Sequence, residues 1–137
     1  MNIMKLFTPK SKVAYLYEDS TLRQSLEKMK FHGFSAIPVI RRDGTYLGTL
    51  AEGDLLAYIA DNQNMHYTTV NHSCVKDIIN TDYNPPVAID ESFKVIISRL
   101  AEQSFLAVTD DRGMLVGIIT KRDVIKYLAE RLPDDFE

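Results

Sequence analysis

The sequence predicts an α/β (α+β) protein made of two tandem β-α-β-β-α repeats. The main observation is an internal repeat, because residues 37–59 align without gaps on residues 106–128 at a constant offset of 69 positions. The second observation is that short β-type runs alternate in both copies with segments that carry the helical period. Five aligned pairs are identical, namely Val39/Val108, Gly44/Gly113, Gly48/Gly117, Asp54/Asp123 and Tyr58/Tyr127.

Each repeat is expected to open with a short strand that leads into a helix. Residues 13–17 and 85–89 are rich in apolar side chains, and each run is followed by acidic or hydroxyl residues that favour a helix start. Apolar residues then recur at helical spacing in both copies. These positions are Leu22, Leu26 and Met29 in the first repeat and Phe93, Ile96, Ile97 and Leu100 in the second.

A β-hairpin and a closing helix are expected to complete each repeat. Each hairpin has a glycine in its turn, which is typical of tight connections between strands. The expected strands are 36–40 with 46–50, and 105–109 with 115–119. The polar segment 61–73 is expected to be a linker, and the two repeats would form two domains, residues 1–70 and 71–137.

Both closing helices are apolar on more than one face. Residues 55–60 and 124–129 consist mostly of apolar side chains, and such a helix needs burial on more than one side. One side belongs to the sheet of its own repeat. The other side predicts a homodimer with two-fold symmetry, although burial of the two halves against each other explains the periodicity equally well.

The composition excludes several classes of protein. The 137 residues are 45% hydrophobic and 26% charged, as in ordinary globular domains, and no apolar run approaches the roughly 20 residues of a membrane-spanning helix. The formal net charge is -3 and no Lys/Arg cluster is longer than a dipeptide, so nucleic-acid binding is not expected. The single cysteine, Cys74, cannot form an internal disulfide, which fits a reducing, cytoplasmic compartment.

No motif for catalysis or metal binding is present. The histidines His32, His66 and His72 lack the spacing of metal ligands. The sequence also lacks the patterns of a catalytic triad, a phosphate-binding loop or a paired-carboxylate site. We therefore expect neither an enzyme nor a metalloprotein.

Each repeat carries the same motif at the start of its closing helix. The motif runs from a glycine through a short apolar stretch to an aspartate six residues later, as GTLAEGD (48–54) and GIITKRD (117–123). Two such motifs in tandem β-α-β-β-α units resemble the CBS domain pair, the family named after cystathionine β-synthase, over nearly the whole chain. The resemblance implies two halves packed sheet against sheet about a pseudo-two-fold axis, with two clefts for adenosine ligands or, in some members, a cyclic dinucleotide. It also implies a regulatory module that dimerises through its helices.

The second motif is the expected ribose-binding site. The resemblance implies that the Asp123 carboxylate accepts hydrogen bonds from both ribose hydroxyls and that Thr120 supplies another. Asp123 should contribute more, because hydrogen bonds to charged groups are worth roughly 1.5 to 3 kcal/mol and those to neutral groups about 0.5 to 1.5 kcal/mol. Thr120 and Asp123 also match a variant of the helix capping box, which needs no ligand, and the same side chains can serve both roles.

By the same resemblance, apolar surface holds the adenine base and basic residues contact the phosphates. The start of the closing helix attracts anions through its free amide donors and its dipole. The implied base contacts are Phe34, Ser35, Ala36 and Ile118, and the segment 8–14 is implied to complete the cleft. The implied phosphate contacts are Lys10, Lys12, Lys121 and Arg122, of which Lys10 and Lys12 match simple solvated lysines equally well.

The first motif predicts a second, weaker site at Thr49 and Asp54. Ala51 lacks the hydroxyl of the second motif, a loss of about 0.5 to 1.5 kcal/mol. Glu52 and Gly53 replace the basic pair, so the local charge becomes negative where phosphates are expected. Thr49 would face the same cleft as Ala51, although an ordinary β-branched strand residue explains it better.

These observations predict a ligand-sensing module. It would bind an adenine nucleotide or adenosine derivative (AMP, ADP, ATP or S-adenosylmethionine) mainly at Thr120 and Asp123, as a regulatory ligand and not as a catalytic cofactor. It would then signal to a separate partner protein by favouring one of two arrangements of the module. The alternatives are a receptor for cyclic di-AMP, and a scaffold that has lost ligand binding and uses its helices only to assemble.

Overall fold

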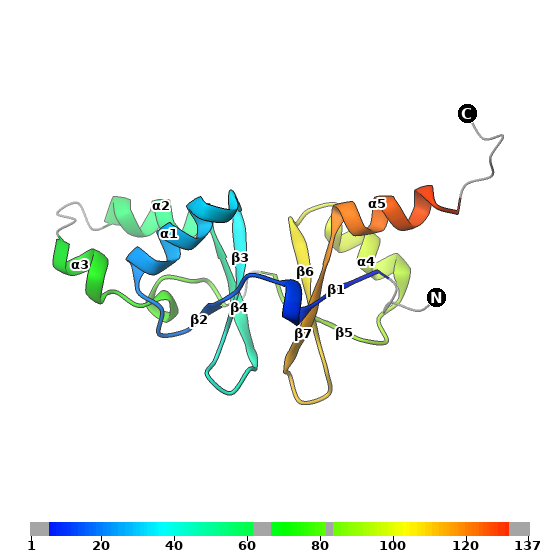
Figure 1. The fold of residues 1–137 in the computed structure, drawn as a ribbon, viewed down its shortest axis with the longest axis horizontal. Helices are drawn as coiled ribbons and strands as arrows, with labels where there is room; N and C mark the ends of the chain where they lie inside the picture. Colours follow the sequence, from blue (N-terminus) through cyan, green and yellow to red (C-terminus); the bar gives the residue numbers. More distant parts are fainter. Residues whose placement is uncertain (1–5, 62–66, 82–83, 132–137) are drawn as a thin grey trace. The chain divides into compact units, whose positions relative to one another are not determined.

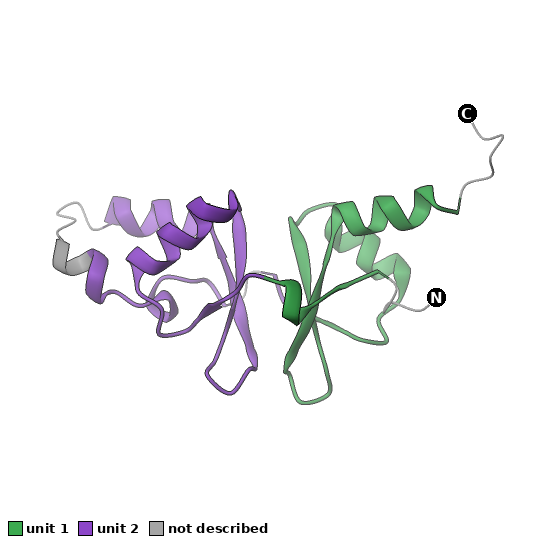
Figure 2. Cartoon of the chain, in the orientation of Figure 1, with its two compact units in different colours: residues 1–13, 86–137 green, residues 14–85 purple. Residues whose placement is uncertain are grey.

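The computed structural model describes residues 6–61, 67–81 and 84–131 and shows two compact units. Unit 2 comprises residues 14–85 and unit 1 comprises residues 1–13 together with 86–137 (Figure 2). Each unit holds one repeat. The division differs from the expected domains 1–70 and 71–137, because the segment at Thr8 pairs with a strand of the second repeat and the segment at Asn80 bridges to a strand of the first.

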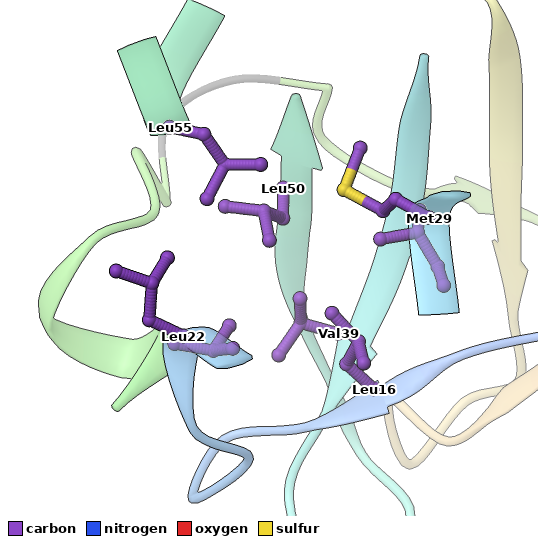
Figure 3. Close-up of a cluster of buried hydrophobic side chains, with 8 residues drawn as sticks. Leu16, Leu22, Met29, Val39, Leu50 and Leu55 are labelled. Carbon is purple, nitrogen blue, oxygen red and sulfur yellow. The ribbon is translucent and has the colours of Figure 1, made fainter. Parts of the chain in front are cut away.

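Unit 2 is built on a three-stranded sheet in the order β2-β3-β4, with β2 parallel to β3 and β3 antiparallel to β4 (Figure 1). Helices α1 and α2 pack on the sheet through a buried apolar cluster in which Leu22, Met29 and Leu55 meet Val39 and Leu50 (Figure 3). The elements are β2 (Leu16–Tyr17), α1 (Leu22–His32), β3 (Ala36–Ile40), β4 (Tyr46–Ala51), α2 (Glu52–Asp61), α3 (Tyr67–His72) and the 3-10 turn η3 (Val75–Asp77).

Unit 1 repeats this plan and adds one strand from the N-terminal segment. Its sheet has the order β1-β7-β6-β5, with β5 parallel to β6 and β1 antiparallel to β7. The core lies between the sheet and helices α4 and α5, where Ile96 and Val124 pack on Leu106 and Ile119. The elements are β1 (Thr8–Pro9), the 3-10 turn η2 (Lys10–Lys12), β5 (Val87–Ala88), α4 (Phe93–Leu100), β6 (Phe105–Thr109), β7 (Leu115–Thr120) and α5 (Lys121–Ala129).

The local signals in the sequence explain where these elements begin and turn. Thr21 caps α1 with a capping box, in which Thr21 and Gln24 exchange side-chain to backbone hydrogen bonds. Ser92 caps α4 by accepting a hydrogen bond from the Val95 amide. The two hairpins turn at Gly44 and Gly113, whose φ angles of 95° and 80° lie in the region that glycine adopts at low cost. The predicted β-α-β-β-α order is therefore confirmed in both units.

Four elements differ from the expectation, namely β1, α3, β2 and β5. Strand β1 was not expected, and it forms because the N-terminal segment reaches an edge of the second sheet. The expected linker 61–73 contains the short helix α3 over its described end, so treating the whole segment as a linker was wrong. The opening strands β2 and β5 are only two residues long, which is shorter than the apolar runs 13–17 and 85–89.

Each closing helix carries large apolar side chains on its surface. Leu56 of α2 is 68% exposed, and the aligned residue Ile125 of α5 is 66% exposed. Only Leu55 is buried in α2 and only Val124 in α5. Leu56 and Ile125 are therefore large apolar side chains at matching positions on the surfaces of the two closing helices. Within the described part of the chain, no helix has the length and apolar character needed to cross a membrane.

Candidate functional site

The turn from β7 into α5 holds Thr120 and Asp123 in one fixed arrangement. The Thr120 hydroxyl oxygen accepts a hydrogen bond from the Asp123 amide at 3.0 Å, and Asp123 Oδ2 accepts one from the Thr120 amide at 3.1 Å. This reciprocal pair is a capping box, so the capping interpretation of the motif is confirmed. The motif thus fixes the orientation of the Asp123 side chain.

Thr8 is a third member of this cluster. It begins the segment 8–14 that the family resemblance placed at this cleft, although no individual role was predicted for Thr8. Its hydroxyl donates to Asp123 Oδ2 at 3.2 Å, across a sequence separation of 115 residues. Thr8 reaches Asp123 because β1 lies directly against β7, with Thr8 opposite Ile118 and Pro9 opposite Gly117. A Cβ atom at Gly117 would overlap the Phe7 ring and the Thr8 carbonyl oxygen. A glycine inside a strand signals such a close backbone approach, and this was the available clue.

The two carboxylate oxygens of Asp123 differ in their hydrogen bonds. Oδ2 accepts both hydrogen bonds described above, whereas Oδ1 accepts none from the described residues. The side chain is partly exposed. It borders a shallow hollow of about 210 Å³ lined by Leu6, Phe7, Asp123, Lys126, Tyr127 and Glu130. A carboxylate oxygen can accept two hydrogen bonds, so Asp123 can bind a donor without losing its internal contacts.

The four residues predicted to contact phosphates lie in unit 1, the unit that also contains Asp123. Lys10 and Lys12 form η2, which directly follows Thr8 and Pro9 in the chain, and Lys121 and Arg122 form the first turn of α5. The side chains of Lys12, Lys121 and Arg122 make no ion pair with any described residue. The N-terminus of α5 adds the positive end of its dipole, so this part of unit 1 favours an anion.

The predicted base contacts are divided between the two units. Ile118 lies on β7 in unit 1 and is half-buried. Phe34, Ser35 and Ala36 belong to unit 2, where the Phe34 ring is 40% exposed and stacks on His32 with ring centres 4.9 Å apart. The Ser35 carbonyl accepts a hydrogen bond from the Glu52 amide at the start of α2. The cleft that these residues would complete stays a prediction.

The first motif lacks most of this arrangement. Asp54 Oδ2 accepts a single hydrogen bond, from the Ala51 amide at 2.9 Å. The residue aligned with Thr120 is Ala51, which has no hydroxyl to cap α2, and Glu52 and Gly53 are both exposed. Thr49 is fully buried, and its hydroxyl is within hydrogen-bonding distance of Tyr46 and Asn84. These contacts favour an ordinary buried strand residue at Thr49 over a side chain that faces a ligand cleft.

Two carboxylates in the hairpin turns have shifted pKa values. The Thr45 amide and hydroxyl, which donate to Asp43, lower the pKa of that carboxyl below its usual value. The Met114 amide is the main cause that lowers the pKa of Asp110. Desolvation opposes it as the second-largest effect, and the Arg112 amide lowers the pKa further by a smaller amount. These bonds stabilise the turns. The described residues contain no group of three or more His, Cys, Asp or Glu side chains placed to hold a metal ion.

The fold and the site together define a domain built from a tandem repeat. Each β-α-β-β-α unit has a turn that runs from a glycine to an aspartate between its last strand and its last helix. The chain belongs to the CBS domain family, whose model matches residues 4–61 and 75–130. The two matches fall on the two repeats, so the resemblance inferred from the motifs is confirmed.

Known proteins that resemble this chain include a much longer enzyme. The chain is 30% identical over 122 residues to inosine-5'-monophosphate dehydrogenase of Chlorobaculum parvum, an alignment that covers 87% of this chain and 23% of that protein. It spans about a fifth of the length of the next two relatives as well, with coverage of 22% in each.

Two solved structures share the fold over nearly their whole length. The CbpB protein of Listeria monocytogenes in complex with c-di-AMP has a TM-score of 0.82 at 22% identity, with 95% of this chain and 96% of that chain covered. CBSX2 in complex with AMP has a TM-score of 0.77 at 21% identity, with coverage of 94% and 96%. At these identities the similarity establishes the fold class.

Proposed function

We propose that this protein is a regulatory module that binds an adenine nucleotide or adenosine derivative through Thr120 and Asp123 of unit 1. The observation that carries the proposal is the state of the Asp123 carboxylate. Oδ2 is held by Thr8 and Thr120, while Oδ1 accepts no hydrogen bond from the described residues. A ribose offers two neighbouring hydroxyl donors, and a pre-oriented carboxylate binds such donors without a further entropic cost of ordering its own side chain.

The charges of unit 1 support an anionic ligand. Lys121 and Arg122 lie one and two residues after the ribose-binding threonine, at the start of α5, and Lys10 and Lys12 follow Thr8. A nucleotide whose ribose binds Asp123 can direct its phosphates toward these groups. The candidates are AMP, ADP, ATP and S-adenosylmethionine. Of these, the anionic nucleotides gain most from the basic residues.

Relatives favour the same chemistry and supply a second candidate. CBSX2 was solved with AMP and CbpB with c-di-AMP. Both ligands contain adenine and ribose. AMP offers Asp123 two neighbouring ribose hydroxyls, whereas each ribose of c-di-AMP offers only one, because its 3'-oxygen is esterified to phosphate. We therefore keep c-di-AMP as the second candidate ligand, and a ligand-free scaffold as the alternative from another class.

The proposed role is regulation and not catalysis. Ligand binding would shift the population between two arrangements of the module, which a separate effector protein would read. The effector would be a protein, and we expect neither a nucleic acid nor a membrane as partner. We also propose a homodimer assembled through the helices that expose Leu56 and Ile125, in the cytoplasm.

A ligand panel tests the proposal. The chain has no Trp and 7 Tyr, so nucleotide that copurifies with it would raise the absorbance at 260 nm clearly above that of the protein. Purified protein is then heated with AMP, ATP, S-adenosylmethionine or c-di-AMP, and at least one of them should raise the melting temperature, as expected for a ligand that binds only the folded state. A spectrum without nucleotide and no shift with any of the four would refute the sensor in favour of the scaffold.

A matched pair of variants tests the site. Asp123→Ala should weaken binding by about 10- to 150-fold, which corresponds to the roughly 1.5 to 3 kcal/mol of a charged hydrogen bond. The aligned change Asp54→Ala in unit 2 should change affinity less than about twofold. Equal losses in the two variants, measured by calorimetric titration, would contradict the assignment of the main site to unit 1.

A further inference from the structure

Unit 2 contains a closed ring of three hydrogen bonds around Thr49. The side-chain amide of Asn84 donates to Thr49 Oγ1 at 3.3 Å, and the Tyr46 hydroxyl donates to the Asn84 carbonyl oxygen at 2.8 Å. The Tyr46 and Thr49 hydroxyl oxygens lie 2.6 Å apart. Because the one Tyr46 proton points to the Asn84 carbonyl, the Thr49 hydroxyl donates to Tyr46. Each hydroxyl therefore both donates and accepts, which is the arrangement in which buried hydrogen bonds reinforce one another.

Asn84 is held in this ring at a conformational cost. It is only 2% exposed, and its φ of 58° is the one positive value at a non-glycine position among the described residues. Asparagine adopts this left-handed conformation more readily than most residues. A buried amide is costly unless its polar atoms are hydrogen-bonded, and the ring supplies partners for both its side chain and its carbonyl. The Asn84 side chain is therefore an integral, hydrogen-bonded part of the unit 2 interior.

The ring occupies the position that corresponds to the base-binding surface of the other unit. At the repeat offset of 69 residues, Thr49 aligns with Ile118 and Tyr46 aligns with Leu115. Ile118 is half-buried, whereas Thr49 is 0% exposed. Neither Leu115 nor Ile118 has a hydroxyl, so the second repeat cannot form such a ring. The two repeats thus differ at the strand surface as well as in the motif.

We propose that the Asn84 side chain fills the nucleotide site of the first repeat from within the chain, so that each chain binds a single nucleotide. The inference rests on the proposed function, together with the base contact at Ile118 that the family resemblance implies. The Asn84 side chain is a second reason why the two repeats would differ in nucleotide binding, in addition to the differences between their motifs. Ala51 and Glu52 weaken the first site for a ribose and for phosphates, and Asn84 closes the surface for the base.

The test restores the motif of the first repeat and then removes the side chain of Asn84. The background variant Ala51→Thr with Glu52→Lys returns the hydroxyl and a basic residue to the first motif. Asn84→Gly is then added, because glycine keeps the positive φ without strain while the amide is lost. Calorimetric titration with AMP gives the number of nucleotides bound per chain for the wild type, the background and the full variant, each checked for a cooperative melt.

The expected result is one AMP per chain for the wild type and for the background variant, and two for the full variant. Two AMP molecules in the background variant would overturn the inference, because Asn84 would not be closing the site. One AMP in a folded full variant would overturn it as well. If the wild type binds no AMP, the AMP form of the proposed function fails, and the closure of the site is decided by the following ligand-free measurement.

Accessibility of position 49 tests the closure without a ligand. Thr49→Cys is made in a Cys74→Ser background, and the reaction of its thiol with an aromatic disulfide reagent is followed by absorbance. Adding Asn84→Gly should speed the reaction at least tenfold, because the side chain that covers position 49 is gone. Equal rates with and without Asn84→Gly in folded protein would show that Asn84 does not cover this surface, and the inference would fail.

Discussion

The hydrogen bond from Thr8 to Asp123 connects the first strand of the chain to its last helix, and Thr8→Val removes it. Valine keeps the β-branched shape that suits a strand, so the change deletes the hydroxyl with little other disturbance. A hydrogen bond to a charged group contributes roughly 1.5 to 3 kcal/mol. The distance of 3.2 Å is longer than the usual 2.7 to 2.8 Å for a hydroxyl donor, and both side chains are partly exposed, so the lower end of that range applies.

We therefore expect Thr8→Val to lower the stability of the protein by about 1.5 kcal/mol. For a chain of this length such a loss lowers the melting temperature by about 3 to 7 °C. Nucleotide affinity should also fall severalfold, because Asp123 loses one of the two donors that orient its carboxylate. Thr8→Ser keeps the hydroxyl and is the matched control, and both variants are compared by thermal melting and calorimetric titration.

Two results would refute this reasoning. If Thr8→Val and Thr8→Ser melt within 1 °C of each other, the hydroxyl does not contribute to stability. If Thr8→Val binds nucleotide more tightly than the wild type, Thr8 competes with the ribose for Asp123 and does not position it. The capping box formed by Asp123 and Thr120 does not include Thr8. Either outcome would therefore show that Asp123 caps α5 without help from Thr8.

Three further predictions concern stability and assembly. Gly117→Ala should lower the free energy of unfolding, measured by urea denaturation, by about 1 to 3 kcal/mol, because its Cβ would overlap the N-terminal segment. Gly48→Ala should cost less, because the nearest neighbour of its Cβ is 3.4 Å away. Similar losses in the two variants would contradict the close crossing at Gly117. The lowered pKa of Asp110 stabilises the protein above the unfolded-state pKa of about 4, and this stabilisation is lost as the pH falls through the lower folded-state pKa. The melting temperature of Asp110→Asn should therefore drop less between pH 6 and pH 3 than that of the wild type. Parallel curves of melting temperature against pH would contradict a contribution of Asp110. Leu56→Asp or Ile125→Asp should convert a dimer into monomers in light scattering, and a monomeric wild type or two unaffected variants would exclude this interface.

The repeat was predictable because its signals are local. Hairpin glycines, hydroxyl caps and helical spacing each act within a few residues, and they recur at one offset in both halves. The cap at Thr120 and the turns at Gly44 and Gly113 follow from such signals and are confirmed. The extents of the opening strands were less predictable, because pairing with β3 and β6, and not the apolar run itself, decides where β2 and β5 end.

The contacts of the candidate site depend on residues far apart in the chain. Thr8 meets Asp123 across 115 positions, and Asn84 meets Thr49 across 35. No periodicity within a repeat predicts either contact, because both involve segments that lie outside the repeating unit. The sequence nevertheless contained one clue, since Gly117 marks a strand position where another backbone approaches closely.

The sequence by itself determined the family, the order of the elements and the difference in charge between the two motifs, because these follow from residue types at fixed spacing. Only the tertiary structure decided how the two aspartates differ in their surroundings. The close crossing at Gly117 brings Thr8 to Asp123, and the buried ring at Asn84 covers Thr49. Both result from packing between distant segments, which fixes the hydrogen-bond partners of a side chain independently of its neighbours in the sequence.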